Sequence, residues 1–463
     1  MAPMILDQRT SVLADEIPQL RMIGLEPDQP YHISAEMLDD IGRTWRSAAT
    51  FIADEQGVID LSAVAPLEGS YDGVDAAGLF WSARLQQPTG ELSWMDPRSI
   101  PYFLKSDLTP TTYTVSVHQV HQLHQTQPEQ QHYQEKQDQQ AHQAQQNHQE
   151  QASIPASLLL ATTSIALRYL SQGVSCISCT DSNEGFIGKY FMALTNQATQ
   201  LPALIVVGGS GGGFAWSETV AALLASRGFN TMAVAYFDYA GSYGLPAELV
   251  DVPLEQFGTC IKWLQSRPEV NGNRIGVIGI SKGAELSLLL GSTFPEELKA
   301  IVAYAPAHCV MQGITMRGSL PVSSWSYNGQ PFAFLPYPDD YNPSLNFDRA
   351  QLHDIHIRAM QNEAAVERSR IPVQQMKASL LLISGDKDEL GPTSEMSLEV
   401  LDHLAQHQYP YTVQHLRLPD AGHSFFVPNL PPNCLNDEVT VPAAASGDRE
   451  TWKEMLHFLR QYV

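Results

Sequence analysis

From about Gly185 onward, apolar runs of strand length alternate with stretches of helix length, and this alternation constrains the fold more than any other feature. The run at residues 203–207 is apolar throughout, which is typical of a strand buried on both faces of a parallel sheet. Residues 254–265 carry apolar side chains along one helical face. Further strands are predicted at residues 232–236, 274–279, 301–304, 380–383 and 413–418, and a further helix at residues 217–227. Repeated strand–helix–strand order predicts an α/β fold, with helices on both faces of a mostly parallel sheet.

Residues 16–174 follow a different pattern. Residues 31–37 alternate apolar and polar side chains with period two, and residues 45–53 can form the returning strand. Turn signals at residues 39–42 and 54–57 follow these two segments, and short strands at such spacing predict a small antiparallel β-sandwich. We therefore expect an N-terminal β-sandwich domain at residues 1–175 and an α/β domain at residues 176–463.

Residues 118–151 form a low-complexity tract dominated by Gln and His. Its histidines are His118, His121, His124, His132, His142 and His148. The tract has too few apolar side chains to offset the entropy of ordering, so we expect a disordered or partly helical insertion. The flanking segments, 111–117 and 157–170, are predicted strands that pair across it. A His-rich metal-binding tract is the alternative, but irregular spacing without Cys or carboxylate clusters disfavours a specific site.

The net charge of −23 excludes some classes of partner. Nucleic-acid binding needs a basic footprint, and the sequence has no Lys/Arg run, RNA-binding signature or zinc-finger spacing. An acidic protein should also avoid anionic membrane surfaces. No run approaches the ~18 apolar residues of a membrane span, and the first residues do not resemble a signal peptide. We expect a soluble protein with no membrane span and no nucleic-acid partner.

Five cysteines are too few for a disulfide scaffold in a chain of 463 residues. Cys176 and Cys179 form a single C-x-x-C, which lacks the second pair that a zinc site needs, so a structural role is favoured. This cysteine usage favours the cytoplasm. No cofactor and no metal are predicted.

The segment Gly279-Ile280-Ser281-Lys282-Gly283 is a G-x-S-x-G pentapeptide. It lies between the predicted strand at 274–279 and a helical run at 284–290, as a nucleophile elbow requires. Ser281 would then be exposed above the sheet at the N-terminus of a helix. An ordinary glycine-rich turn is the alternative, and the partners that follow favour the elbow.

A serine nucleophile needs a base and an acid that orients it, in the chain order Ser, Asp or Glu, His. Asp388 follows the predicted strand at 380–383 and is the favoured acid, with Asp386 as its rival. His423 lies in the loop after the last predicted strand, directly behind Gly422, and is the favoured base. The sequence therefore predicts a Ser281–Asp388–His423 triad.

Two backbone N–H groups should form the oxyanion hole of such a site. One is the N–H of Lys282, the residue after the nucleophile. The other should come from the glycine-rich loop 208–213, for which Ser210 and Gly211 are the candidates. A phosphate-binding loop is the weaker interpretation, because G-x-x-x-x-G-K-[ST] and G-x-G-x-x-G are both absent.

The chain resembles the type I acyl-CoA thioesterases and the bile acid-CoA:amino acid N-acyltransferases. The similarity covers nearly the whole chain apart from the Gln/His tract. The segments that carry it are 279–286, 266–270, 235–237 and 418–423 in the second half, and 24–27, 69–73 and 78–81 in the first. The N-terminal segments are the more specific, because most serine hydrolases have no such domain.

The resemblance implies a β-sandwich in front of an α/β-hydrolase domain, with the active site between them. It also implies hydrolysis of a fatty acyl-CoA, the expected small-molecule partner, to CoA and a fatty acid. The transferases of this family usually carry Cys at the nucleophile, so Ser281 favours water as acceptor. The chain departs from the family at Ala305-Pro306, after Asp388 and after His423, which affects acyl specificity. Lys282 and Arg317 are candidates for local positive charge toward CoA.

Three alternatives remain at this point. The enzyme could transfer the acyl group to an amine or alcohol, or it could be a carboxylesterase or dienelactone-hydrolase-like enzyme, since the fold does not determine the leaving group. A non-enzymatic assembly protein acting through the Gln/His arm is the third.

Overall fold

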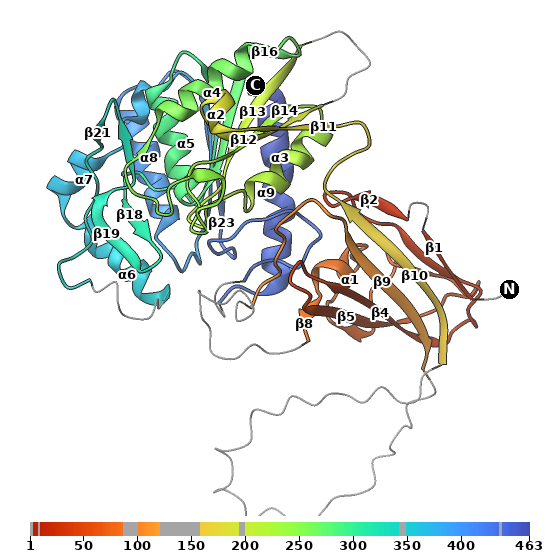
Figure 1. Ribbon diagram of the computed structural model, residues 1–463. Helices are drawn as coiled ribbons and strands as arrows, with labels where there is room; N and C mark the ends of the chain where they lie inside the picture. Colours follow the sequence, from red (N-terminus) through yellow and green to blue (C-terminus); the bar gives the residue numbers. More distant parts are fainter. Residues whose placement is uncertain are drawn as a thin grey trace, which may run out of the picture.

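The computed structural model describes residues 3–7, 10–86, 101–120, 158–193, 200–341, 349–434 and 438–463. Figure 1 shows a smaller part built of strands beside a larger part in which helices surround a sheet. The fold class predicted from the sequence is confirmed. Most of the Gln/His tract lies outside the described residues.

The N-terminal part contains two sheets. The larger has the order β2-β10-β9-β4-β5-β7, with β8 beside β5, and the smaller has the order β1-β3-β6. Neighbouring strands are antiparallel except β2 and β10, which are parallel. The elements are β1 (Met4–Asp7), β2 (Ser11–Leu13), β3 (Leu20–Ile23), β4 (Pro30–Leu38), β5 (Thr44–Ile52), β6 (Ile59–Asp60), β7 (Glu68–Gly69), α1 (Gly78–Trp81), β8 (Arg84–Leu85), β9 (Thr111–Gln119) and β10 (Leu158–Arg168). The predicted pairing of the strands that flank the Gln/His tract is confirmed, since β9 and β10 are antiparallel neighbours.

The C-terminal part is built on one eight-stranded sheet with the order β11-β12-β14-β13-β16-β17-β22-β23. Strand β12 is antiparallel to both neighbours, and the strands from β14 to β23 are parallel. The strands are β11 (Ser175–Cys179), β12 (Ile187–Met192), β13 (Leu201–Val207), β14 (Asn230–Ala235), β16 (Val270–Ile280), β17 (Leu298–Tyr304), β22 (Ser379–Gly385) and β23 (Val413–Leu418). This is the parallel sheet that the apolar runs predict.

Helices cover both faces of this sheet. The principal ones are α3 (Ser217–Ser226), α4 (Glu255–Gln265), α5 (Lys282–Thr293), α8 (Thr393–Gln406) and α9 (Val441–Tyr462). Alternate residues of β13 enter two different cores: Leu204 and Val206 pack with α3 and α9, whereas Ile205 and Val207 pack with α4, α5 and α8. The period-two alternation of a strand therefore separates the two helical layers.

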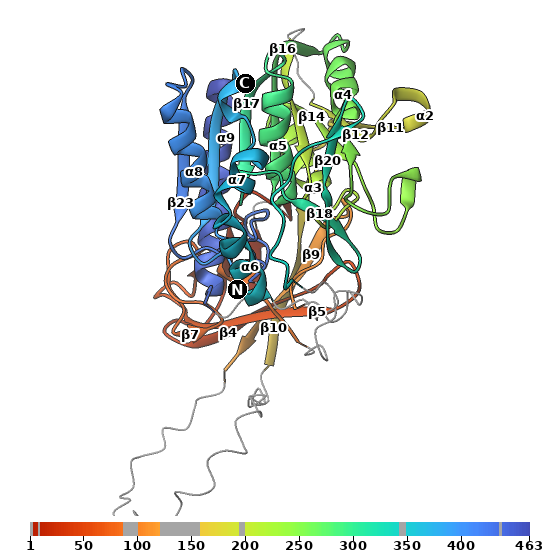
Figure 2. The ribbon, with the colours of Figure 1, turned by 90° about the vertical axis from the view of Figure 1, so that its left-hand side faces the viewer.

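A segment between β17 and β22 forms a cap that the sequence patterns do not predict. It contains β18 (Gln312–Thr315), β19 (Gly318–Ser323), β20 (Trp325–Tyr327), β21 (Gln330–Pro331), α6 (Arg349–Met360), α7 (Glu363–Ser369) and the turn η3 (Val373–Gln375). Strand β20 also pairs with the short β15 (Val252–Pro253). Figures 1 and 2 place α6, β18 and β19 at the end of the sheet where its parallel strands terminate. Three further short elements, α2 (Asp181–Glu184), β11 and β12, were likewise not predicted.

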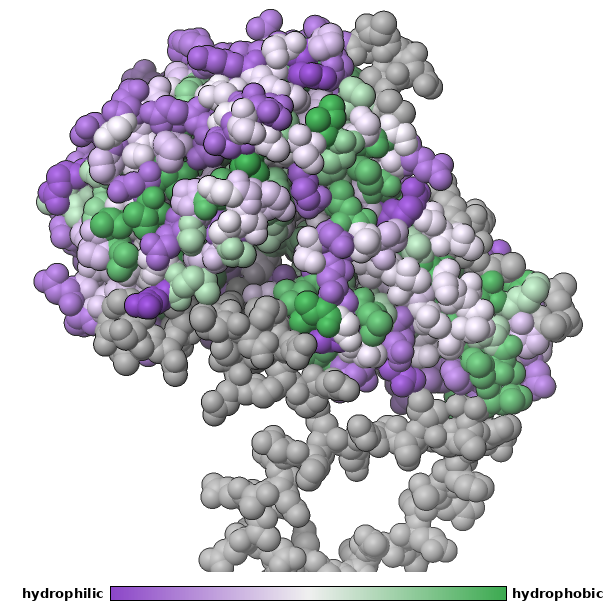
Figure 3. All heavy atoms as spheres, viewed as in Figure 1, coloured by the Kyte–Doolittle hydropathy of each residue, from purple (hydrophilic) through white to green (hydrophobic). Residues whose placement is uncertain are grey.

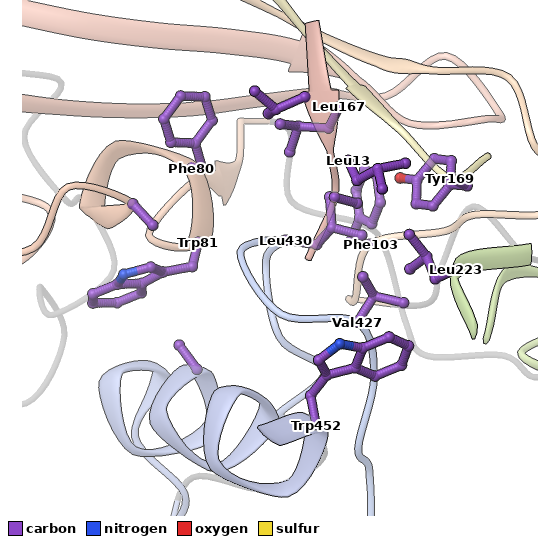
Figure 4. Close-up of a cluster of buried hydrophobic side chains, with 14 of the residues drawn as sticks. Leu13, Phe80, Trp81, Phe103, Leu167, Tyr169, Leu223, Val427, Leu430 and Trp452 are labelled. Atoms are coloured by element: carbon purple, nitrogen blue, oxygen red, sulfur yellow. The ribbon is translucent and has the colours of Figure 1, made fainter. Parts of the chain in front are cut away.

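The face of the sheet covered by α3 and α9 also joins the two parts of the molecule. Figure 4 shows Leu223 and Trp452 gathered with Leu13, Phe103 and Tyr169 in one buried cluster. On the face drawn in Figure 3, hydrophilic residues dominate the outer rim of the larger part. None of the helices in the described ranges is both long and apolar enough to cross a bilayer.

Asp15 connects the two parts through polar contacts. Its carboxylate accepts hydrogen bonds from Arg227 Nε at 2.7 Å and from Trp452 Nε1 at 3.1 Å. The Asp15 side chain is only 1% exposed, so the surrounding groups cannot exchange these bonds for water. This acidic residue therefore holds the C-terminal end of α3 and the middle of α9 against the N-terminal part.

We expect Asp15→Ala to lower the free energy of unfolding by about 2 kcal/mol, because it removes the acceptor of an indole N–H and leaves a half-buried guanidinium with Glu16 as its remaining partner. Thermal unfolding of the purified variant measures this. Arg21→Ala is the matched control, because the Arg21–Asp60 pair is 3.3 Å long and Arg21 is 52% exposed. Equal shifts for the two variants would contradict a special role for Asp15.

Asp448 of α9 is a second buried acid. Its Oδ1 accepts the Phe426 N–H at 2.8 Å, which ties the loop after His423 to α9. Burial raises the pKa of Asp448 to about 7, against the opposing effects of this hydrogen bond and Arg449. An unfolded Asp has a pKa of about 3.9, so between pH ~4 and ~7 the folded protein holds a proton that the unfolded chain releases. The stability from Asp448 is therefore lost as the pH rises through this window.

We predict that Asp448→Asn exceeds the thermal midpoint of the wild type by a small margin at pH 5 and by a clearly larger margin at pH 8. Asparagine keeps the acceptor for Phe426 but removes the buried charge, a gain on the order of 3 kcal/mol at pH 8. Asp386→Asn is the control of opposite sign, because the pKa of Asp386 is lowered: burial raises it, but Arg417 and Ser394 outweigh burial. A gain at pH 8 that is no larger than at pH 5 would refute the assignment.

Candidate active site

Ser281 occupies a strained turn between β16 and α5. Its φ of 56° and ψ of −120° lie outside the regions that non-glycine residues normally adopt. A Cβ on Gly279 would overlap the carbonyl group of Gly283, and one on Gly283 would overlap the carbonyl oxygen of Gly208. The glycines of G-x-S-x-G are therefore required by the close approach of three backbone segments. Strain of this kind is characteristic of functional sites.

Asp388 and His423 meet after the last two strands of the sheet. The Nδ1 atom of His423 lies 3.0 and 2.8 Å from the two carboxylate oxygens of Asp388. The carboxylate also accepts the backbone N–H groups of Leu390 at 2.9 Å and Gly391 at 3.1 Å, and the Thr393 hydroxyl at 2.5 Å. The Asp388 residue is 5% exposed.

Electrostatics keep Asp388 ionised. Burial alone would raise its pKa, but the attraction of His423 and the hydrogen bonds outweigh burial and leave the pKa below its ordinary value. An ionised carboxylate can only accept hydrogen bonds, so Nδ1 of His423 is the protonated ring nitrogen. The other nitrogen, Nε2, is then the basic one.

Asp386, the rival acid, has different partners. It accepts Arg417 Nε at 2.5 Å and the Ser394 hydroxyl at 2.7 Å. Of the two acids that the sequence offered, the structure pairs Asp388 with His423.

Backbone hydrogen bonds join the loops that carry these residues. The N–H of Ser281 donates to Tyr304 O at 2.8 Å, and that of Ala305 donates to Ile383 O at 2.7 Å. A third bond joins the residues that follow β22 and β23, because the N–H of Lys387 donates to Ala421 O at 3.0 Å. The ends of β16, β17, β22 and β23 are thus linked in sequence. Ser281 and the Asp388–His423 pair therefore lie on the same edge of the sheet.

The loop that contains Ser210 and Gly211 lies beside Ser281. A Cβ on Gly209 would be 3.2 Å from the Ser281 Cβ, so the backbone of Gly209 lies against the nucleophile. Lys282 is the first residue of α5, so its N–H has no acceptor within the helix. Both backbone segments predicted for the oxyanion hole border the nucleophile, although the sequence did not single out Gly209.

The Lys282 side chain does not supply a positive charge toward CoA. Its Nζ lies 2.9 and 2.7 Å from the two carboxylate oxygens of the fully buried Glu285. This ion pair neutralises its charge, so Lys282 is not a cation toward solvent. Arg317 lies in the exposed turn between β18 and β19.

Helix α6 of the cap adds His356, a residue that sequence patterns missed. Its ring nitrogens contact Tyr337 Oη at 3.1 Å and Leu352 O at 2.8 Å. Burial lowers the pKa of His356 to about 4; the Leu352 carbonyl and Asp388 oppose this shift, whereas His423 adds to it. The cap therefore presents a neutral imidazole near the Asp388–His423 pair.

A pocket of about 420 Å³ lies at the other end of the sheet, along β11 and β12. Its walls include Cys179, Lys189 and Phe214, but none of Ser281, Asp388 and His423. Burial raises the pKa of the Cys176 thiol, and that of Cys179 to about 11, so neither is an activated nucleophile. The candidate active site is therefore at the edge of the sheet that carries Ser281, and not in this pocket.

Known proteins resemble this chain along most of its length. Residues 15–152 match the acyl-CoA thioester hydrolase/BAAT N-terminal region, and residues 252–463 match the BAAT/acyl-CoA thioester hydrolase C terminal region. Acyl-coenzyme A thioesterase 1 of Rattus norvegicus is 26% identical over 426 residues, which cover 90% of this chain and 84% of that protein. Bile acid-CoA:amino acid N-acyltransferase of Mus musculus is 25% identical over 466 residues, covering 98% and 96%.

Among solved structures, a putative dienelactone hydrolase from Klebsiella pneumoniae is 16% identical with a TM-score of 0.39, covering 63% of this chain and 100% of its own. An acylaminoacyl peptidase from Pyrococcus horikoshii is 14% identical with a TM-score of 0.39, covering 62% and 41%. The two regional matches together span both parts of the fold, in the same order as in the family. The chain belongs to the family of acyl-CoA thioester hydrolases and bile acid-CoA:amino acid N-acyltransferases.

Proposed function

We propose that this protein hydrolyses fatty acyl-CoA to CoA and a free fatty acid, with Ser281 as nucleophile, His423 as base and Asp388 as the acid that orients it. The observation that carries the proposal is the buried Asp388–His423 pair on the same sheet edge as the strained Ser281. The relatives named acyl-coenzyme A thioesterase support the substrate class. Ser281 supports water as acceptor, since the transferases of the family usually carry Cys there.

The reaction begins when His423 Nε2 takes the Ser281 hydroxyl proton as Oγ attacks the thioester carbonyl carbon. Asp388 stabilises the imidazolium that forms. The N–H of Lys282 and an N–H from the loop of Ser210 and Gly211 hold the negative oxygen of the tetrahedral intermediate. The intermediate collapses by breaking the carbon–sulfur bond, and CoA leaves as a thiol with the proton from His423.

The second half repeats this chemistry with water. His423 takes a proton from a water molecule, whose oxygen attacks the acyl-serine carbonyl. The bond to Ser281 Oγ breaks, and the serine recovers its proton from His423. Hydrolysis requires that water, rather than an amine, attacks the acyl-serine. This second step therefore distinguishes a thioesterase from an acyltransferase.

We also propose that residues 176–463 form the catalytic domain and residues 1–175 an accessory one, since all the residues assigned to the chemistry lie in the former. We place the activity in the cytoplasm, on the basis of the sparse cysteines. Two relatives are named mitochondrial, so cell fractionation tests this assignment.

We expect wild-type protein to release free thiol from a panel of acyl-CoAs, short to long, and Ser281→Ala to be slower by about 10³-fold or more. The reason is that the variant lacks the attacking oxygen while keeping the backbone of the oxyanion hole. A thiol-reactive dye follows the reaction, with unchanged thermal unfolding as the control. Thiol release with acyl-glycine or acyl-taurine as product would instead indicate acyl transfer. Cleavage confined to oxygen esters would contradict the proposal.

Asp388→Asn should lower kcat by about 10²–10⁴-fold, because a neutral amide no longer selects the ring tautomer or stabilises the imidazolium. Asp386→Asn is the matched control two residues away, and we expect it to change kcat by less than about threefold, since its carboxylate serves Arg417 and Ser394. Steady-state kinetics on one long-chain acyl-CoA compare the two. A larger loss for Asp386→Asn would reverse the assignment of the acid.

A further inference from the structure

A buried ion pair opens the helix that follows the nucleophile, and the proposed mechanism makes no use of its side chains. Lys282 and Glu285 are 7% and 0% exposed, and the Lys282 ammonium spans both carboxylate oxygens. The ammonium also lies 3.4 Å from Met311 O and 5.7 Å from the centre of the Trp325 ring. Two charges are thus held away from water within four residues of Ser281.

The remaining partners of Glu285 come from the cap. Its Oε1 accepts the Met311 N–H at 3.1 Å and the Trp325 Nε1–H at 2.7 Å. Trp325 begins β20 and is 0% exposed. A single carboxylate therefore connects the first turn of α5 to two separate segments of the cap.

The Trp325 indole is also connected, through Tyr236, to the glycine-rich loop 208–213. The Trp325 ring packs on Tyr236 with 5.5 Å between ring centres, and the Tyr236 hydroxyl donates to Gly208 O at 2.6 Å. Gly208 directly precedes Gly209, which lies against Ser281, and the Gly208 carbonyl oxygen faces Gly283 of α5. The contacts thus run from Lys282 through Glu285, Trp325 and Tyr236 to the loop of Ser210 and Gly211.

Stability alone does not explain such an arrangement. Burial lowers the pKa of Lys282 and raises that of Glu285, and each partner opposes the shift of the other. Desolvating two charges consumes much of their attraction, so apolar residues of similar volume often stabilise a protein as well. A charged pair with directional bonds fixes orientation better than apolar packing does, and the groups oriented here are the two backbones beside Ser281.

We propose that Lys282, Glu285, Trp325 and Tyr236 form a positioning network that sets the spacing of the two oxyanion-hole segments and makes it depend on the seated cap. The inference rests on the proposed function. The side chains do not touch the substrate; they hold the Lys282 N–H on one side of Ser281 and the glycine loop on the other. Loss of one link moves a donor by a fraction of an ångström, which weakens transition-state stabilisation more than substrate binding.

The test compares Trp325→Phe and Tyr236→Phe with wild type. Each variant removes one polar group, the indole N–H or the hydroxyl, and keeps an aromatic ring. We expect kcat for acyl-CoA to fall by about 10–100-fold per active site titrated with a fluorophosphonate, with KM changed by less than about threefold.

Two inhibitors separate positioning from a merely structural role. A trifluoromethyl ketone with a fatty chain forms a hemiketal oxyanion with Ser281, whereas an S-alkyl-CoA has no carbonyl. The network predicts that affinity for the ketone falls by the same factor as kcat and that affinity for S-alkyl-CoA is unchanged. Equal weakening of both inhibitors, or an unchanged kcat, would overturn the proposal.

A second test asks whether a double variant recovers the activity that a single variant loses. Lys282→Met leaves Glu285 as an uncompensated buried charge, whereas Lys282→Met/Glu285→Gln keeps a neutral acceptor for Trp325 and Met311, and we expect it to recover at least about tenfold in kcat. Lys377→Met is the matched control, since it breaks the exposed Lys377–Glu296 pair, and it should leave kcat unchanged. No recovery in the double variant would contradict the network. Absence of thiol release by wild type would instead refute the thioesterase itself, a separate outcome.

Discussion

The architecture of the site depends on the close contact of three backbone segments around Ser281. Strand β16 and helix α5 approach so closely that Gly279 has no room for a Cβ, and Gly283 is pressed against the carbonyl oxygen of Gly208. A side chain at either glycine would push α5 away from the sheet. Because the same contact places the glycine loop beside the serine, it forms both the turn that carries the half-buried nucleophile and the surroundings in which negative charge can develop.

The parallel sheet supplies the other residues through position rather than sequence proximity. Consecutive strand ends are joined by backbone hydrogen bonds, so Ser281 and His423, more than 100 residues apart in the chain, come to lie on one edge of the sheet. Asp386 and Asp388 show that two positions along the chain change the partner of an acid. The N–H of Asp386 still continues the ladder to Leu418 O, which directs its side chain to Arg417. Two residues later the chain has turned, and Asp388 reaches His423.

The sequence predicted features that arise from local patterns. Apolar runs located β13, β16, β17, β22 and β23, and the glycines of the pentapeptide located the elbow. It missed β11 and β12, because β11 is exposed at four of its five residues and Lys189 interrupts the apolar run of β12. The cap was missed for another reason: its short strands are held by partners such as Glu285, 40 residues from Trp325, which no periodicity reveals. The Asp15–Arg227 contact spans 212 positions and leaves no local signal either.

A polyanionic substrate presents an acidic protein with a specific problem. The net charge of −23 repels CoA at long range, so electrostatic steering cannot assist its approach. Several cations of the described residues are already engaged at short range: Lys282 by Glu285, Lys189 by Glu218 and Arg449 by Asp75. Recognition of an acyl-CoA then depends on contacts made after encounter, with exposed cations such as Arg317, backbone N–H groups, hydroxyls and apolar surface for the acyl chain. In such a protein, the accurate placement of neutral donors at Ser281 matters more than the overall field, which is the task that the buried Lys282–Glu285 pair is positioned to perform.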